Sequence, residues 1–224
     1  MRALCGMLLL VSSTAAYAQT EAPGLRPHHV TLAAGINWSG GYDIGSSTAQ
    51  LRGNGFGTTP PMVPLFEADS RITPTPAPEF RFGVALTRTV AVEAGVVVSH
   101  PRVAFGISND SEAPAQQLLG EELQQYLVDG AVTWQLPWHS GRLAPFALGG
   151  AGYLRQLHED RMLGETGQVY YAGGGARYWL KDSSRSRSLG VRGDFRINIR
   201  QNGIDFENTT RTYPSLTLSI FLGL

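Results

Sequence analysis

The stretch S188-L-G-V-R-G-D-F-R-I-N-I-R200 separates into two faces when every second residue is read. One face carries Leu189, Val191, Phe195, Ile197 and Ile199, and the other carries Arg192, Asp194, Arg196, Asn198 and Arg200. A repeat of two predicts a β-strand, because successive side chains of a strand point to opposite faces of the sheet. A water-soluble protein would bury the aliphatic face, whereas a transmembrane barrel would turn it to lipid and enclose the charges.

Seven further segments repeat this alternation, so the sequence predicts eight strands. They lie at about residues 29–39, 80–86, 90–99, 125–136, 143–155, 170–180 and 214–224, and the two glycine-rich segments at 143–155 and 170–180 alternate less clearly. No apolar run after the N-terminus is long enough for a spanning helix, and a closed β-barrel is the other structure that satisfies its backbone groups in lipid. We therefore expect an all-β protein, an eight-stranded antiparallel up-and-down transmembrane β-barrel.

The expected connections alternate between short and long. Short connections lie at 87–89, 137–141 and 181–187, and long ones at about 40–78, 101–120, 156–167 and 201–212. Outer-membrane barrels have short periplasmic turns and long extracellular loops, so both termini would be periplasmic. The longest connection, 40–78, is rich in glycine and proline, and we expect it to be an irregular, mobile surface loop. After Pro101 the apolar residues change from even-numbered to odd-numbered positions, which indicates a bulge or a strand that continues above the membrane. Residues 116–125 suggest a helical turn.

The N-terminus has the pattern of a signal peptide. Arg2 precedes a short apolar run, and Ala-Tyr-Ala at 16–18 provides the small residues of a cleavage site. We expect residues 1–18 to be removed and residues 19–224 to form an outer-membrane β-barrel domain. Cys5 is the only cysteine of the chain, so the exported protein would have no disulfide.

The charge balance excludes some partners. The chain has 18 basic and 18 acidic residues, which excludes broad electrostatic binding of nucleic acid or of an anionic membrane. Lys181 is the only lysine, whereas the charged outer face of a soluble barrel should contain many. Within the strands, the charged residues fall on the face opposite the aliphatic one: Arg81, Glu93, Asp129, Arg177, Arg192, Asp194 and Arg196. Because arginine pairs carboxylates in a bidentate manner, we expect these seven residues to form a charge network in the lumen.

Aromatic residues lie at or near the ends of the expected strands. They are Trp38, Trp134, Trp138, Tyr153, Tyr178, Trp179 and Tyr213. Such positions are typical of the aromatic girdles at the two membrane interfaces. The alternative is that they are ordinary core aromatics.

The sequence resembles the small outer-membrane β-barrels of the OmpA/opacity-protein type. The resemblance rests on the signal peptide, the eight amphipathic strands, P145-F-A-L-G-G-A-G-Y153, G173-G-G-A-R-Y-W-L180 and G190-V-R-G-D-F-R196, and a membrane strand at the C-terminus. It implies a monomeric barrel of the Gram-negative cell envelope, surrounded by outer-membrane lipid and lipopolysaccharide. It also implies insertion by the barrel-assembly machinery, which reads the last strand. That strand usually ends in an aromatic residue, whereas this chain ends in Leu224.

Several motifs do not lead to a chemical function. Arg192-Gly193-Asp194 spells an integrin tripeptide but lies within an expected strand, so we expect no adhesion through it. The histidines have no metal-ligand spacing: His28, His29, His100, His139 and His158. Neither His139-Ser140 nor 158–160 places a nucleophile beside a base on a strand end. We expect no catalytic residue, no metal and no cofactor. Two alternatives stay open: a secreted, soluble lipocalin-like barrel that binds an apolar ligand, and a lipid A-modifying outer-membrane enzyme.

Overall fold

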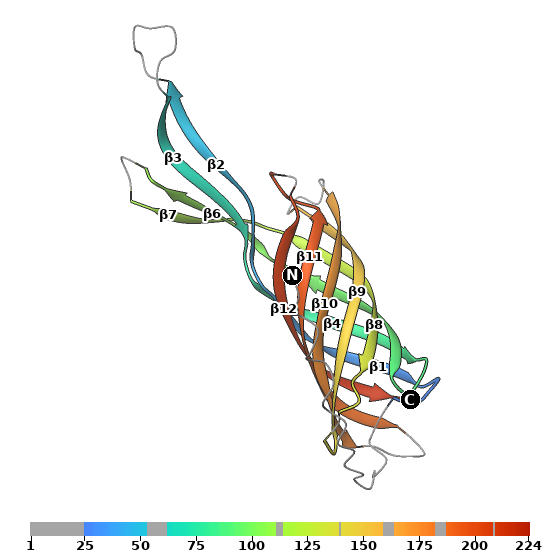
Figure 1. Ribbon diagram of the computed structural model, residues 1–224. Coiled ribbons are helices and arrows are strands. Elements are labelled where there is room, and N and C mark those ends of the chain that lie inside the picture. Colours follow the sequence, from blue (N-terminus) through green and yellow to red (C-terminus); the bar gives the residue numbers. More distant parts are fainter. Residues whose placement is uncertain are drawn as a thin grey trace, which may run out of the picture.

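Eight strands form a closed antiparallel barrel in the computed structural model, which describes residues 25–52, 62–110, 114–138, 140–158, 164–181, 187–207 and 209–224 (Figure 1). The barrel strands are β1 (Val30–Ser39), β4 (Thr75–Ala85), β5 (Val90–Ser99), β8 (Gln124–Gln135), β9 (Leu143–Leu157), β10 (Gly164–Lys181), β11 (Ser188–Asn202) and β12 (Arg211–Gly223). They pair in chain order, and β12 closes on β1. All eight predicted strands and the up-and-down barrel are confirmed. The predicted signal peptide and His139 lie outside the described residues.

The barrel wall is apolar outside and polar inside. Ile36 is 62% exposed and Leu218 63%, whereas Arg81 and Asp194 are 6% and 2% exposed. In the opening stretch 188–200, the aliphatic side chains point outward and the charged ones into the barrel. A water-soluble barrel has the opposite arrangement, because its apolar side chains avoid water. No helix among the described residues is long and apolar enough to cross a membrane.

The strand ends define two different ends of the barrel. The short connections β4–β5, β8–β9 and β10–β11 lie at one end together with the C-terminus, and we call this the turn end. At the opposite end, which we call the loop end, the chain leaves the barrel after β1 and after β5 and returns in β4 and β8 (Figure 1). The predicted alternation of short and long connections is therefore present.

The two longest connections contain strands rather than irregular loops. A second sheet has the order β2-β3-β6-β7, with β2 (Tyr42–Arg52), β3 (Met62–Ile72), β6 (Arg102–Ser108) and β7 (Gln116–Glu122). This sheet projects beyond the barrel at the loop end (Figure 1). The expectation of an irregular loop at 40–78 is therefore wrong, and so is the helical turn at 116–125. The strand that continues after Pro101 is confirmed as β6.

The prolines of 40–78 are compatible with strands because of where they lie. Pro76 and Pro78 are in β4 opposite Trp38 and Ile36 of β1. The first pair of β4 with β5 is at Glu79, so one edge of β4 has no partner strand at 75–78. Proline is tolerated at such an edge, since no ladder hydrogen bond requires its missing N–H.

The seven aromatic residues expected in the girdles divide into two groups. Five are exposed near strand ends, as expected: Trp38, Trp134, Trp138, Tyr153 and Tyr178. Trp179 and Tyr213 are buried, so their assignment to the girdle is wrong. Trp179 is on the inner face at the turn end, where it packs edge-on against Phe221 with ring centroids 5.6 Å apart. Tyr213 stacks on Tyr42 at the loop end, with centroids 4.8 Å apart.

Candidate functional site: the charged barrel interior

Eight ionised side chains lie together in the middle of the barrel. They include all seven residues expected there from the sequence, and the eighth is Glu79: Arg81, Arg177, Arg192 and Arg196 with Glu79, Glu93, Asp129 and Asp194. All eight are buried. The set contains four cations and four anions, so its formal charge is zero. Mutual neutralisation matters because an unpaired charge in a low-dielectric interior is strongly unfavourable.

Glu93 on β5 is bound by two arginines from the opposite side of the barrel. Arg192 on β11 donates from Nη1 to both carboxylate oxygens of Glu93, at 2.8 and 2.7 Å. Arg177 on β10 donates to Oε1 of Glu93 at 2.8 Å and to the hydroxyl of Thr133 at 3.3 Å. The guanidinium groups of Arg177 and Arg192 each lie 4.7 Å from the centre of the Phe146 ring. Two cations therefore lie near one another because they share a carboxylate and an aromatic ring.

Asp194 and Glu79 extend this arrangement along β11 and onto β4. Asp194 accepts hydrogen bonds from Nε of Arg192 at 2.8 Å and from Nε of Arg196 at 2.6 Å. Arg196 also donates to Oε1 of Glu79 at 3.0 Å. The same Glu79 oxygen accepts a hydrogen bond from Nε of Arg81. Cations and anions thus alternate from one wall of the barrel to the other.

Arg81 closes the alternation into a ring. Its Nη1 lies 3.8 Å from Oε2 of Glu93, and its Nη2 donates to Asp129 at 2.9 Å. Asp129 also accepts a hydrogen bond from the Tyr171 hydroxyl at 2.9 Å. We call the set the charge ring: Glu93, Arg192, Asp194, Arg196, Glu79 and Arg81 in order, with Arg177 and Asp129 attached. Five strands contribute to it, so it connects the barrel walls across the lumen.

Glu79 was missed in the sequence because it was assigned to the loop. The second strand was expected to begin at Phe80, whereas β4 begins at Thr75. Extending the alternation by one residue places Glu79 on the face of Arg81. Its second oxygen accepts a hydrogen bond from Thr217 on β12 at 2.7 Å, and Thr217 accepts one from Asn37 on β1 at 2.9 Å. Neutral polar groups therefore complete the interior beside the charge ring.

A buried apolar cluster lies at the turn end of the barrel. Ala144, Trp179 and Phe221 form a buried cluster there, against which Ala33 packs. Trp179 and Phe221 also border a cavity of about 30 Å³, which Arg177 lines as well. This is close to the space that one water molecule occupies in the liquid.

A second apolar cluster covers the loop end. It consists of Tyr42, Ile44, Ile72, Val103, Leu123, Ile204 and Tyr213, from the barrel, the projecting sheet and the β11–β12 connection. Arg200 lies beneath it, fully buried, and donates to the Tyr42 hydroxyl at 2.9 Å and to the Ile204 carbonyl at 2.7 Å. Buried apolar clusters thus lie at both ends of the barrel interior.

Asp205 and Arg211 fix the β11–β12 connection above this cluster. Arg211 donates to the two oxygens of Asp205 at 2.6 and 3.1 Å and to Glu207 at 2.9 Å. Burial opposes ionisation of Asp205, but the hydrogen bonds from Arg211 and from the Glu207 and Thr209 N–H groups outweigh it and lower the pKa of Asp205 to about 2. The connection is therefore held by an ionised carboxylate.

The remaining sequence motifs have simple places in the structure. Arg192 and Asp194 belong to the charge ring, so they are not displayed for an external receptor. Nδ1 of His158 lies 3.0 Å from Oε2 of Glu121, and no described hydroxyl group forms a hydrogen bond with this histidine. Among the described residues, no group of three or more His, Cys, Asp or Glu side chains is arranged to hold a metal ion.

The chain is similar to the solved structures of three outer-membrane proteins. The outer membrane protein OprG from Pseudomonas aeruginosa is 9% identical over 91% of this chain and 98% of its own, with a TM-score of 0.51. The chain has the fold of the small outer-membrane β-barrels. Neisserial surface protein A, NspA, is 11% identical over 88% of this chain and 96% of its own, with a TM-score of 0.49. Ail, the attachment invasion locus protein of Yersinia pestis, is 7% identical over 89% of this chain and 100% of its own, with a TM-score of 0.44. No protein-family model and no curated protein sequence matches the chain. The resemblance inferred from the sequence is confirmed for the fold.

Proposed function

We propose that the protein is an integral outer-membrane barrel whose lumen is closed by the charge ring, and that it displays the β2-β3-β6-β7 sheet at the cell surface. Its role is structural or binding rather than catalytic. The observation that carries this proposal is the reversed polarity of the barrel. Apolar side chains such as Ile36 and Leu218 are exposed around the wall, while eight ionised groups are buried within it. Lipid is the environment that makes such a wall favourable.

The same polarity argues against the soluble alternative, and the contacts of His158 give no support to the enzymatic one. A soluble lipocalin-like barrel needs an apolar cavity for its ligand and a polar outer wall, and this barrel has charges where that cavity would be. A lipid A-modifying enzyme needs a nucleophile beside a base, and no hydroxyl group of the described residues forms a hydrogen bond with His158. We therefore propose a monomer that contacts outer-membrane lipid and lipopolysaccharide and that is inserted by the barrel-assembly machinery after loss of its signal peptide.

Fractionation tests the location. We expect the protein to sediment with outer membranes, to resist carbonate extraction, and to migrate differently on gels before and after boiling, because closed barrels resist detergent unfolding until heated. The matched control is the same sample boiled in advance. Recovery from the periplasm as a soluble species without detergent would contradict the proposal and favour the lipocalin-like alternative.

Conductance tests the closed lumen. About eight strands enclose a space that side chains alone can fill, and here the charge ring crosses it. We expect the purified protein to give little or no steady current in planar bilayers. An outer-membrane porin measured in the same bilayers is the positive control. Large and stable open channels would show that the lumen is a hydrated passage.

A further inference from the structure

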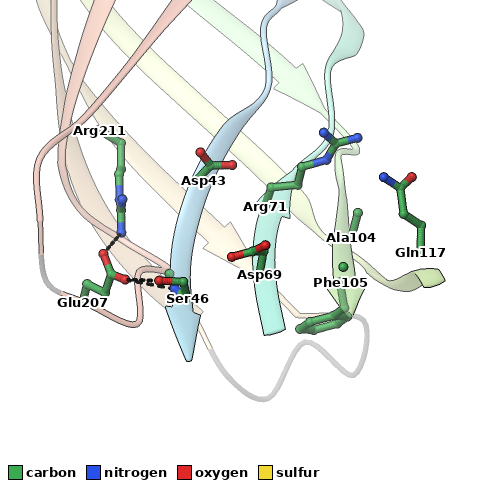
Figure 2. Close-up of a pocket in the computed structure, with 11 residues that line it drawn as sticks. Asp43, Ser46, Asp69, Arg71, Ala104, Phe105, Gln117, Glu207 and Arg211 are labelled. Carbon is green, nitrogen blue, oxygen red and sulfur yellow. Dashed lines mark hydrogen bonds and ion pairs between the residues drawn. The ribbon is translucent and has the colours of Figure 1, made fainter. Parts of the chain in front are cut away.

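The projecting sheet has a hollow of about 490 Å³ beside the β11–β12 connection (Figure 2). This volume falls within the range of about 300–1,000 Å³ that is usual for ligand pockets. The hollow opens at the loop end, above the apolar cluster that covers the barrel. It is therefore separate from the charge ring, and its lining contains both acidic and basic side chains.

One wall of the hollow is already neutralised by contacts within the protein. Glu207 accepts hydrogen bonds from Arg211 at 2.9 Å and from the Ser46 N–H at 2.9 Å (Figure 2). Arg211 is also bound to Asp205. The Ser46–Glu207 hydrogen bond holds this wall against β2. A second hydrogen bond, from the Phe206 N–H to the Ile44 carbonyl at 2.8 Å, does the same. This wall therefore fixes the shape of the hollow, and its charged groups are already paired within the protein.

The floor of the hollow carries exposed charged groups without a partner among the described residues. Asp43 lies opposite Arg71 in the sheet, and Asp69 lies opposite Ser46. Residues opposite one another on antiparallel strands share a face, so these side chains point to the same side. Asp43, Asp69 and Arg71 are exposed, and none forms a hydrogen bond or ion pair with any described residue. The Arg71 guanidinium extends away from Asp43 (Figure 2).

These free groups define what a ligand must offer. Carboxylates can only accept hydrogen bonds and a guanidinium can only donate them, so the ligand needs donors for Asp43 and Asp69 and an acceptor for Arg71. Hydroxyl groups do both. Two acids beside one arginine repel an anionic ligand, and the charge of Arg71 opposes the binding of a polycation. Residues 104–106 of β6 also line the hollow, where Ala104 and Gly106 share the face of Arg71 and Asp69, whereas Phe105 lies opposite Ser70 and points to the other face.

We propose that this hollow binds a neutral carbohydrate. Asp43 and Asp69 accept hydrogen bonds from its hydroxyl groups, and Arg71 donates to a hydroxyl or ring oxygen. The proposal rests on the surface exposure of this sheet proposed above. It names the ligand class of the displayed surface, whether the carbohydrate belongs to the same cell or comes from outside.

A glycan array tests the ligand class. The probe is the full-length detergent-solubilised protein, fluorescently labelled, on an array of neutral, sulfated, carboxylated and amino glycans. One set of spots carries polysaccharide released from the producing cells, and another carries neutral glycans of other organisms. We expect binding to neutral glycans, and the set that binds identifies the source. Binding to no neutral glycan, or to charged glycans only, would overturn the proposal.

Paired variants locate the site. Asp69→Ala and Arg71→Ala should each weaken neutral-glycan binding at least tenfold, whereas Arg102→Ala should leave it unchanged. Arg102 is an exposed arginine of the same sheet that pairs with Glu122, and it does not line the hollow. Equal binding by all three variants would overturn the assignment to this hollow.

Fractionation of the same cells separates the two proposals. An outer-membrane protein that binds no neutral glycan would overturn the ligand and leave the barrel function intact. A soluble protein whose glycan binding depends on Arg71 would keep the ligand and overturn the outer-membrane function.

Discussion

Arg192 and Glu93 face each other across the diameter of the barrel, and one nitrogen of Arg192 contacts both oxygens of Glu93 at 2.8 and 2.7 Å. Their strands, β11 and β5, are four strands apart in either direction around the barrel. The contact therefore braces opposite walls, whereas the backbone ladders join only neighbouring strands.

Replacing Glu93 by glutamine should strongly destabilise the barrel. The change leaves Arg177 and Arg192 without their shared carboxylate, and removing one partner of a buried ion pair costs about 3–5 kcal/mol. We expect a decrease of this size in the free energy of unfolding, measured by urea titration of the protein refolded in lipid vesicles.

The matched control is Glu122→Gln. Glu122 pairs with Arg102 at 3.1 Å, but both side chains are about half exposed. Exposed ion pairs contribute about 0–1 kcal/mol, so this variant should unfold almost as the parent does. Equal stability of the Glu93→Gln variant and the parent would contradict a stabilising role of the charge ring.

Replacing Gly175 by alanine should also destabilise the barrel. Gly175 lies opposite Asp194 in the β10–β11 register. A Cβ there would overlap the Gly193 carbonyl oxygen and lie 2.7 Å from Cβ of Asp194. Overpacking of this kind costs about 1–3 kcal/mol, measured by the same urea titration.

Gly130→Ala is the control for this change. Gly130 is exposed on the outer wall, and a Cβ there would have no atom within 4 Å. Alanine should be neutral or stabilise the protein by up to about 1 kcal/mol, because it restricts the unfolded chain. If alanine changes the free energy of unfolding equally at both positions, the lack of space beside the charge ring does not explain why residue 175 is glycine.

Acid should weaken the contribution of Asp205 to the stability of the folded protein in a defined pH range. Its pKa in the folded protein is about 2, below the ordinary value of 3.8. A carboxyl group with a lowered pKa stabilises the fold fully above its ordinary pKa, and this stabilisation is lost as the pH falls toward the folded value. Asp205→Asn should therefore be less stable than the parent at pH 6, by about 1–3 kcal/mol for a lost charged hydrogen bond.

The difference between the two proteins should narrow from about pH 4 toward pH 2. Urea titrations at a series of pH values measure it, and other acidic groups affect both proteins equally. If the difference in the free energy of unfolding stays constant over this range, ionisation of Asp205 does not contribute to stability.

Cysteine labelling should show which end of the barrel faces outward. Cys5 lies in the predicted signal peptide, so an introduced cysteine would be the only one in the exported protein. We expect a membrane-impermeant maleimide to label Thr48→Cys, at the loop end, on intact cells. Arg88→Cys, at the turn end, should react only after lysis. The reverse pattern would mean that the topology is inverted.

Strand parity is the part of the structure that the sequence predicts best. In β11, Arg192, Asp194 and Arg196 could be assigned to one face because a strand repeats every two residues whatever its surroundings. Glu79 and the strands β2 and β3 were missed for a different reason. Glycine and proline indicate loops locally, but here β2 and β3 pair with each other beyond the barrel, and one edge of β4 has no partner strand at 75–78. Whether a strand tolerates proline depends on which other strands pair with it. The sequence of a single strand does not contain this information.

The hollow on the projecting sheet was not predictable for a related reason. Asp43 and Arg71 are 28 residues apart in sequence (71 − 43), and β3 places Asp69 and Arg71 on the face of Asp43 only through the β2–β3 register. That register includes a shift between Asp43 and Gly45. A shift by one residue changes which side chains share a face, and the sequence alone did not reveal it.

The charge ring also constrains the order in which the chain can acquire its stability. Glu93 and Arg192 are 99 residues apart, and Glu79 and Arg196 are 117 apart. Contacts of such long range form only after the intervening chain has been organised, which makes folding slow. An open sheet, before β12 meets β1, would leave the arginines and carboxylates of the ring on separate, hydrated walls. Dehydration of the interior and closure of the last seam must therefore occur together, as one cooperative step late in assembly.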